Sequence, residues 1–281
     1  MTTHANDVLV DTEWLAERLD DDSIRIVEVD EDPSRYSSRH VPGAIGLDWR
    51  HDLQDRVRRD LLGPEAFAEL VGSRGISREH TVGLYGDRHN WFAAYAFWYF
   101  RYYGHDSIRL LDGGRDRWIA ERRPTTSDPV AYPRLDYAPA AGDESIRARR
   151  DEVEAAIGTA TRLVDVRTPL EFSGELIAMT GYEQEGAQRG GHIPGAVLVQ
   201  WSDAVAEDGT ILPAESLRRL YEGAGVIGAG APVIAYCRIG ERSAHTWFVL
   251  SELLGVPDVK NYDGSWAEWG NLIGVPIETG T

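Results

Sequence analysis

APVIAYCRIGERSAHTWFVLSELL, residues 231–254, contains the only cysteine of the 281-residue chain and decides how this part of it folds. The apolar run from Val233 to Tyr236 predicts a short buried strand. After Ser243, apolar residues recur at helical spacing over Ala244–Leu254, which predicts a helix. Cys237 therefore stands in a loop between the end of a strand and the start of a helix.

This loop has the features that make a cysteine reactive. Gly240 allows the backbone to turn its amides inward around the sulfur, and the helix N-terminus points at the same place. Arg238 and Arg242 add positive charge, and such surroundings favour the thiolate form. A lone cysteine is often only a small buried apolar residue. The two arginines and the strand–loop–helix setting favour a nucleophile instead.

Composition restricts the classes of protein that fit. A net charge of −17 argues against general binding to nucleic acid or to anionic membranes. A single cysteine excludes an intramolecular disulfide and a cysteine-based zinc cluster. The sequence has no apolar run of about 18 residues and no signal-peptide pattern at its start, so we expect a cytoplasmic protein.

The chain contains the same domain twice. The sequence HVPGA at residues 40–44 returns as HIPGA at 192–196, and VGLY at 82–85 matches VIAY at 233–236. A repeat at about 150 residues is too long for a solenoid unit and indicates a duplicated domain. Short apolar strands alternate with helical stretches in each copy, which predicts an α/β fold with a mostly parallel central sheet flanked by helices.

We expect an N-terminal domain at residues 1–124, a linker at 125–147 and a C-terminal domain at 148–281. The second copy carries an insertion of about 15 residues between Ser173 and Arg189. The expected helices are Thr12–Arg18, Pro64–Val71, Trp91–Tyr102, Asp151–Ile157, Ala214–Glu222 and Ala244–Leu254.

The first copy lacks the reactive residues of the second. Gly86 aligns with Cys237, Asp87 with Arg238 and Trp91 with Arg242. We therefore expect the N-terminal domain to be non-catalytic.

Four elements of the second copy, in this order and spacing, carry a family resemblance. They are Leu163–Arg167 with Glu171 and Phe172, Gly191–Ala196, Cys237–Ser243 and Asn261–Trp266. With their counterparts in the first copy, they resemble the tandem-domain rhodaneses, the thiosulfate sulfurtransferases, and most of all those of actinobacteria. The resemblance implies a five-stranded parallel sheet in each domain and catalysis by the C-terminal copy alone.

The resemblance also implies a reaction. The loop cysteine attacks the outer sulfur of thiosulfate or a related sulfane-sulfur donor, sulfite leaves, and the cysteine holds a persulfide. Cyanide or a thiol, a thioredoxin-like protein among the candidates, then accepts the sulfur in a ping-pong cycle. No metal or organic cofactor is needed, and neither nucleic acid nor a membrane is an expected partner.

The residues of the loop take roles on this basis. Cys237 is the expected nucleophile, and Arg238 and Arg242 are the expected anchors for the sulfonate of the donor. The backbone amides around the sulfur come from Arg238, Ile239, Gly240, Glu241, Arg242 and Ser243.

Several of these residues have a structural interpretation as well. Arg238 also fits a solvated loop charge, and Arg242 has Glu241 and Glu171 as potential ion-pair partners. Arg167, which we include among the substrate-binding candidates, fits a structural ion pair better. The remaining candidates are Arg189, which the sequence cannot place, and His40, His192 and His245, which fit structural roles.

Three alternatives remain beside the thiosulfate sulfurtransferase. Enzymes specific for 3-mercaptopyruvate have Gly and then Ser or Thr after the cysteine, followed by Gly-Val-Thr, and Arg238 and Glu241 depart from that loop. The mitochondrial enzymes also use an arginine at the position of Glu171, so their donor-binding geometry does not transfer whole. Phosphatases of the same fold need five residues between cysteine and arginine, whereas four separate Cys237 from Arg242. A persulfide carrier or scaffold without turnover is the third.

Overall fold

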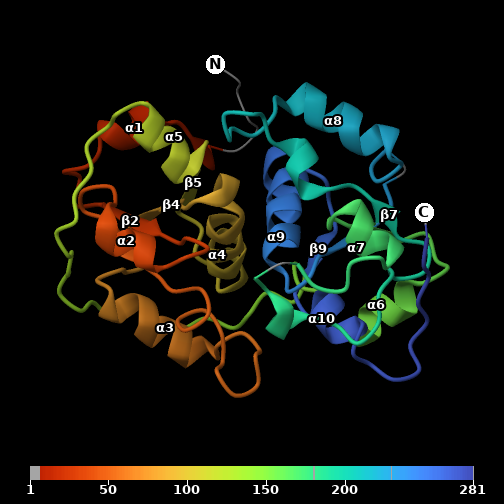
Figure 1. Cartoon of the computed structure of the whole chain (residues 1–281). Coiled ribbons are helices and arrows are strands. Elements are labelled where there is room, and N and C mark those ends of the chain that lie inside the picture. The colour runs from red at the N-terminus through yellow and green to blue at the C-terminus, as the bar shows by residue number, and fades with distance from the viewer. Residues whose placement is uncertain (1–6, 180, 229, 281) are drawn as a thin grey trace. The chain divides into compact units, whose positions relative to one another are not determined.

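The structure is a computed structural model that describes residues 7–179, 181–228 and 230–280, and it divides into two compact units. The first unit runs to Asp143 and includes Ala206–Ile211. The second comprises Glu144–Val205 and the chain from Leu212 onward. Strands and helices alternate around one parallel sheet in each unit, which confirms the predicted α/β fold (Figure 1).

The first unit has a five-stranded parallel sheet with the strand order β1-β5-β4-β2-β3. Its central strands are almost entirely buried, as expected for a parallel sheet with helices on both faces. In chain order its elements are β1 Leu9–Val10, α1 Thr12–Ala16, β2 Ile24–Glu28, α2 Ser34–Ser38, β3 Ile45–Gly46, α3 Pro64–Ser73, β4 Thr81–Tyr85, the 3-10 helix η1 Arg88–Asn90, α4 Trp91–Tyr102, β5 Ile108–Leu111 and α5 Gly114–Ala120.

The second unit has the parallel strand order β7-β6-β8-β9. Its elements are α6 Arg150–Ala156, β6 Arg162–Asp165, α7 Pro169–Ser173, the 3-10 helix η2 Glu183–Glu185, β7 Val197–Leu198, the 3-10 helix η3 Trp201–Ala204, α8 Ala214–Gly223, β8 Val233–Tyr236, α9 Glu241–Trp247, the π-helix η4 Phe248–Leu253, β9 Val259–Tyr262 and α10 Ser265–Trp269.

In the second unit, a single β-bridge stands where a fifth strand was expected. Arg147 pairs with Asn261 in parallel, and the Ala148 amide donates to the Asn261 carbonyl at 3.0 Å. The helix α6 begins at Arg150, so the chain leaves the sheet edge before a strand can form. The five-stranded expectation is therefore met in the first unit, while the second forms four strands and this bridge.

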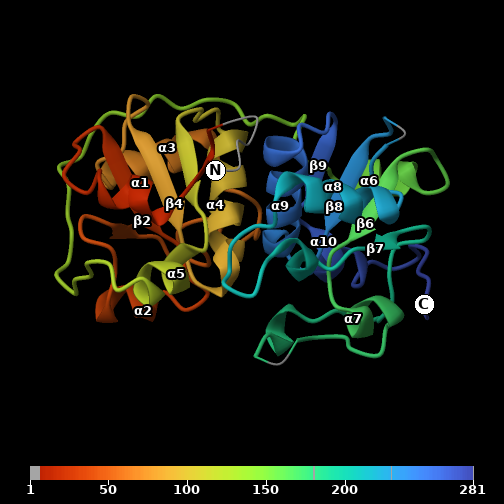
Figure 2. The same ribbon diagram turned by 90° about the horizontal axis from the view of Figure 1, so that it is seen from above.

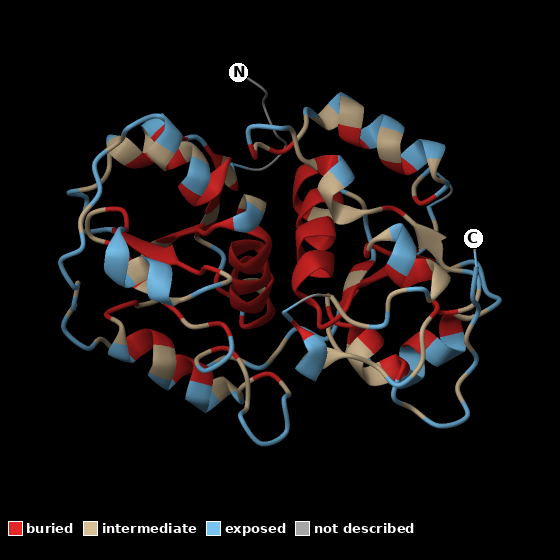
Figure 3. Ribbon diagram, in the orientation of Figure 1, coloured by how far each residue is buried: buried red, intermediate tan, exposed pale blue. Residues whose placement is uncertain are grey.

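Strand β8 lies inside its sheet, between β6 and β9, and this position fixes the cysteine that follows it. Helices α6 and α10 pack on the face that carries Ile234 and Tyr236, and α9 lies on the other face (Figures 1 and 2). All seven residues of α9 are buried (Figure 3). The carboxyl end of β8 therefore delivers Cys237 into a buried place at the start of α9.

The helix after the cysteine differs from the prediction at its start and in its second half. It begins at Glu241, not Ala244, because Gly240 adopts a left-handed conformation with φ +98° and its carbonyl accepts the Ala244 amide at 3.0 Å. From Phe248 the helix continues as a π-helix. Arg242 and Ser243 thus belong to the first helical turn, and the loop proper is only Cys237–Gly240.

The other predicted helices are all present, with small differences at their ends. Four of them begin at the predicted residue: Thr12, Pro64, Trp91 and Ala214. No helix in the described ranges is long and apolar enough to cross a membrane.

Candidate active site

Cys237 is held from two directions, its sulfur by the loop and its backbone by the start of α10. The Gly240 amide donates to Sγ at 3.2 Å. The Cys237 amide donates to the Ser265 hydroxyl at 3.0 Å, and its carbonyl accepts the Trp266 amide at 3.0 Å, so the start of α10 fixes the cysteine backbone. The Cys237 side chain is 0% exposed. An amide aimed at the sulfur is the arrangement that stabilises a thiolate or a persulfide.

Gly240 is required by shape as well as by its backbone angle. A Cβ atom on Gly240 would lie 2.7 Å from Cα and 2.8 Å from Cβ of Asp263. The Gly240 carbonyl also accepts from the Asn261 amide group at 3.0 Å, and Asn261 in turn accepts from the Ser243 hydroxyl at 2.6 Å. Ser243 therefore braces the loop through Asn261, while Gly240 supplies the amide that contacts the sulfur.

Arg238 lies in the site and is only partly satisfied by hydrogen bonds. Its Nη2 donates to Glu241 Oε1 at 2.8 Å and pairs with Glu185 Oε2 at 3.1 Å. Its guanidinium carbon lies 3.7 Å from the ring centroid of Tyr182. The residue is 4% exposed, yet Nε and Nη1 are buried without a hydrogen-bond partner. Buried donors without an acceptor are costly, so these two nitrogens are suited to an anionic ligand that accepts from them.

Arg242 has its terminal nitrogens engaged by Glu171 alone. Nη1 and Nη2 each donate to one Glu171 oxygen at 2.9 Å, which selects Glu171 over Glu241 among the two partners considered from sequence. Burial raises the pKa of Glu171, but the two bonds from Arg242 outweigh burial and bring that pKa down to about 2. Arg242 is buried with its Nε lacking a hydrogen-bond partner. Its main contact is therefore with α7.

The remaining arginine candidates hold the backbone. Arg167 Nε donates to Asp165 at 2.9 Å and its Nη2 to the Gly191 carbonyl at 2.7 Å, so its contacts are those of a structural ion pair. Arg189 donates to main-chain carbonyls just after α10, including that of Gly270 at 3.4 Å. It ties the insertion to that segment, which answers the question that the sequence left open.

The histidine candidates pack against aromatic rings. His192 stacks on Phe172 with ring centroids 3.6 Å apart, and His40 stacks on Tyr36 at 4.0 Å. His245 is buried, with its ring 5.3 Å from that of Trp201. Ile239, the remaining loop residue, is buried as well. These contacts are the packing roles that the sequence analysis favoured for the histidines.

Sequence reasoning missed two residues of the insertion, Tyr182 and Glu185, which contact Arg238. It also missed the effect of the carboxylates on the charge of the site. The two arginines were expected to leave the sulfur in positive surroundings, but Glu171 pairs with Arg242, and Glu185 and Glu241 share Arg238. The one available signal was the insertion itself, because the first copy has no equivalent of it.

The corresponding place in the first unit has no room for a nucleophile. A Cβ atom on Gly86 would lie 2.1 Å from the Val29 carbonyl oxygen. Asp87, which aligns with Arg238, pairs with Arg35 at 2.8 Å. A cysteine at position 86 would therefore require a shift of the backbone around it.

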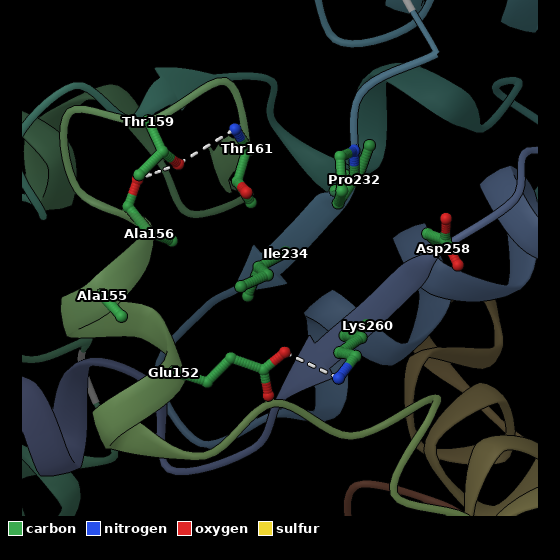
Figure 4. A pocket seen from close by; sticks show the side chains of 10 residues that line it. Glu152, Ala155, Ala156, Thr159, Thr161, Pro232, Ile234, Asp258 and Lys260 are labelled. Carbon is green, nitrogen blue, oxygen red and sulfur yellow. Dashed lines mark hydrogen bonds and ion pairs between the residues drawn. The ribbon is translucent and has the colours of Figure 1, made fainter.

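A cavity of about 460 Å³ opens at the other end of the second sheet, where β6, β8 and β9 begin (Figure 4). Its walls include the ion pair between Glu152 and Lys260. None of the residues that line it is a predicted site residue, and Cys237 follows the opposite end of β8.

Comparison with known proteins places the chain in a family. The sequence pattern of the rhodanese-like domain matches residues 11–121 and 149–272. A protein of Mycobacterium leprae named "putative thiosulfate sulfurtransferase" is 55% identical over 276 residues, covering 98% of this chain and 99% of its own. The sulfur carrier protein TtuD of Thermus thermophilus is 52% identical over 278 residues, covering 98% and 97%.

Among solved structures, the anaerobic ergothioneine biosynthesis enzyme of Chlorobium limicola, in complex with its natural substrate trimethyl histidine, has a TM-score of 0.85. It is 25% identical, over 97% of this chain and 70% of that one. Both copies of the domain lie within the residues that these matches cover. The chain belongs to the rhodanese-like family, with two copies of the domain, and its relatives are named for sulfur transfer.

Proposed function

We propose that this protein is a thiosulfate sulfurtransferase that works through a persulfide on Cys237. The observation that carries the proposal is Arg238, whose buried Nε and Nη1 have no hydrogen-bond partner in the described structure. Arg238 is the residue next to the only cysteine, and an anionic donor would satisfy both nitrogens. Charge-assisted hydrogen bonds from an arginine fork suit the sulfonate oxygens of thiosulfate.

The reaction has two halves. Sγ of Cys237 attacks the outer sulfur of thiosulfate, the sulfur–sulfur bond of the donor breaks, and sulfite leaves with the electron pair. The Gly240 amide, 3.2 Å from Sγ, stabilises the negative charge at the sulfur. Cyanide or a thiol, carried by a small molecule or by a thioredoxin-like protein, then removes the outer sulfur and restores the cysteine.

The first unit and the other loop residues have supporting roles in this proposal. Residues 1–124 form a non-catalytic domain, 125–147 a linker, and 148–281 the catalytic domain. Arg242 adds positive charge near the sulfur and, through Glu171, fixes the first turn of α9 to α7. Arg167 supports the site from behind, through Asp165 and the carbonyl of Gly191.

A second candidate is a persulfide carrier that receives sulfur and passes it to a protein partner without free turnover. The relative named sulfur carrier protein TtuD favours this candidate, because it matches over nearly the whole of both chains. The two functions share the persulfide and differ in the acceptor.

Steady-state kinetics with thiosulfate and cyanide test the proposal. A sulfurtransferase gives many turnovers and parallel double-reciprocal lines, which are typical of a ping-pong cycle. A single burst of sulfite equal to the enzyme, with no further turnover, favours the carrier. More efficient use of 3-mercaptopyruvate than of thiosulfate contradicts the proposed donor.

A further inference from the structure

The carboxylate of Glu241 contacts both the nucleophile and the proposed anion anchor. Its Oε2 lies 3.3 Å from Sγ of Cys237, and its Oε1 accepts from Arg238 Nη2 at 2.8 Å. Glu241 is 1% exposed. The first residue of α9 therefore holds a buried carboxylate against the sulfur that has to attack the donor.

The hydrogen bonds at the sulfur show where its proton points. Sγ accepts a hydrogen bond from the Gly240 amide, so the bond between Sγ and Glu241 is the one in which the thiol donates. Only the thiolate attacks, so this proton has to leave before the sulfur–sulfur bond can form. Cys237 has no exposed surface, and Glu241 Oε2 is the proton acceptor already in contact with it.

A bound donor would share Arg238 with the carboxylates that already surround it. The charged groups around the pair are Arg238 in the loop, Arg242 on α9, Glu171 on α7 and Glu185 in the insertion. The charge of Glu171 is balanced by that of Arg242, whereas Glu185 and Glu241 both pair with Arg238. Thiosulfate brings two further negative charges to Arg238. A proton on Glu241 removes one repelling carboxylate and leaves more of Arg238 for the donor.

We infer that Glu241 is the catalytic proton acceptor for Cys237, an inference that rests on the proposed sulfur transfer. As thiosulfate enters, the S–H bond of Cys237 breaks and its proton moves to Oε2 of Glu241. Sγ then forms a bond to the outer sulfur, and sulfite departs with the electron pair of the broken sulfur–sulfur bond. Sulfite takes the proton from Glu241 and leaves as hydrogensulfite, so Glu241 is a carboxylate again and Cys237 carries an anionic persulfide.

The same contact also fits an opposite role, in which Glu241 keeps the Cys237 thiol protonated and thereby slows the attack on the donor. The two roles differ in the outcome of Glu241→Gln, which keeps the shape of the side chain and a carbonyl oxygen for Arg238 but cannot take up a proton. A proton acceptor is needed for fast attack, so its removal slows persulfide formation. Removal of an inhibitory charge speeds it up.

The test is the rate of persulfide formation, followed by rapid quench and intact-mass analysis, as a function of pH. At neutral pH we expect Glu241→Gln to be slower than wild type by about 100-fold or more, the usual contribution of general base catalysis. We expect its rate to rise about tenfold per pH unit, in proportion to the thiolate that solvent produces, while the wild-type rate changes far less near neutrality.

Glu185→Gln is the matched control, because Glu185 pairs with the same nitrogen of Arg238, and the sulfur contact is made by Glu241. It removes one carboxylate from Arg238 and is expected to keep the wild-type shape of the pH profile. An equal change in both variants would show that Glu241 acts only through the charge on Arg238. A Glu241→Gln rate equal to or above that of wild type would also overturn the inference.

Infrared spectroscopy tests the contact without any sulfur donor. Cys237 is the only cysteine, so the S–H stretching band of the protein has a single source. We expect either an S–H band at lower frequency than that of a thiol in water, or a protonated-carboxyl band that Glu241→Gln lacks. An S–H band at the frequency of a thiol in water would refute the shared proton. Absence of a persulfide in wild type with thiosulfate would instead contradict the proposed function and leave this result standing.

Discussion

Both terminal nitrogens of Arg242 donate to the carboxylate of Glu171, each at 2.9 Å, in the interior of the second unit. The pair joins the first turn of α9 to α7, which are far apart in sequence.

The Arg242–Glu171 pair predicts a loss of stability in acid. The folded state holds the pKa of Glu171 at about 2 against an ordinary 4.5, because Arg242 outweighs the effect of burial. A lowered pKa stabilises the fold above pH 4.5, and this contribution disappears as the pH falls toward 2. The difference in pKa corresponds to about 3 kcal/mol of the free energy of unfolding.

Urea unfolding across this pH range measures the contribution. We expect Glu171→Gln to be about 3 kcal/mol less stable than wild type at neutral pH, since it leaves a buried arginine without its counter-charge. Its stability should also depend less on pH in acid. Glu215→Gln removes an exposed partner of Arg219 and serves as the control. Parallel pH dependence in wild type and Glu171→Gln would contradict the assigned pKa.

Loss of Arg238 should weaken thiosulfate binding. Arg238→Gln removes the charge and the fork geometry, and we expect kcat/KM for thiosulfate to fall by about 10-fold or more, as a charge-assisted anchor is lost. Arg149→Gln, at an exposed arginine paired with Glu144, is the control. Unchanged kinetics in Arg238→Gln would show that another residue anchors the donor.

A methyl group at Gly240 should disrupt the loop. A second glycine with a positive φ but no close neighbour distinguishes the effect of the steric clash from that of backbone strain. Gly240→Ala meets a left-handed φ of +98° and places Cβ 2.7 Å from Asp263. Gly228→Ala meets a φ of +112° with nothing within 4 Å. The backbone conformation alone costs roughly 1–2 kcal/mol.

Thermal unfolding and persulfide formation, measured together, distinguish the two alanine variants. We expect both to be destabilised, but only Gly240→Ala to lose persulfide formation, because only its side chain displaces the segment behind the sulfur. Normal persulfide formation in Gly240→Ala would show that the Gly240 amide is not needed at Sγ.

The insertion should contribute to donor binding through Tyr182. Its ring lies against the guanidinium of Arg238, 3.7 Å from centroid to carbon, a contact worth about 0.5–2 kcal/mol. We expect Tyr182→Ala to raise KM for thiosulfate several-fold. Tyr182→Phe keeps the ring face and should bind thiosulfate as wild type does. Equal KM values for Tyr182→Ala and Tyr182→Phe would exclude a role of the ring.

Strand β8 and the loop after it could be predicted because their signals are local. Four apolar residues in a row, a glycine three residues after the cysteine and a helical apolar pattern all lie within one short stretch. The start of α9 was harder to predict, since nothing in the residue types alone requires Gly240 to be left-handed. Its φ of +98° and its close approach to Asp263 appear only in the folded chain.

The partners of the arginines could not be predicted for a different reason. Arg238 contacts Glu185 and Tyr182 from the insertion, and Arg242 pairs with Glu171. These partners are far from the two arginines in the sequence. Each arginine had several carboxylates as potential partners, and only the tertiary packing chooses among them. The same packing brings Glu241 to the sulfur, which a charge count of the loop does not show.

The most direct test of the account is the intact mass of the protein before and after thiosulfate, without reductant. A covalent persulfide predicts the gain of one sulfur atom, its removal by cyanide, and its absence in Cys237→Ser. No gain of mass with thiosulfate, in protein whose cysteine still reacts with an alkylating agent, would contradict the persulfide mechanism with this donor.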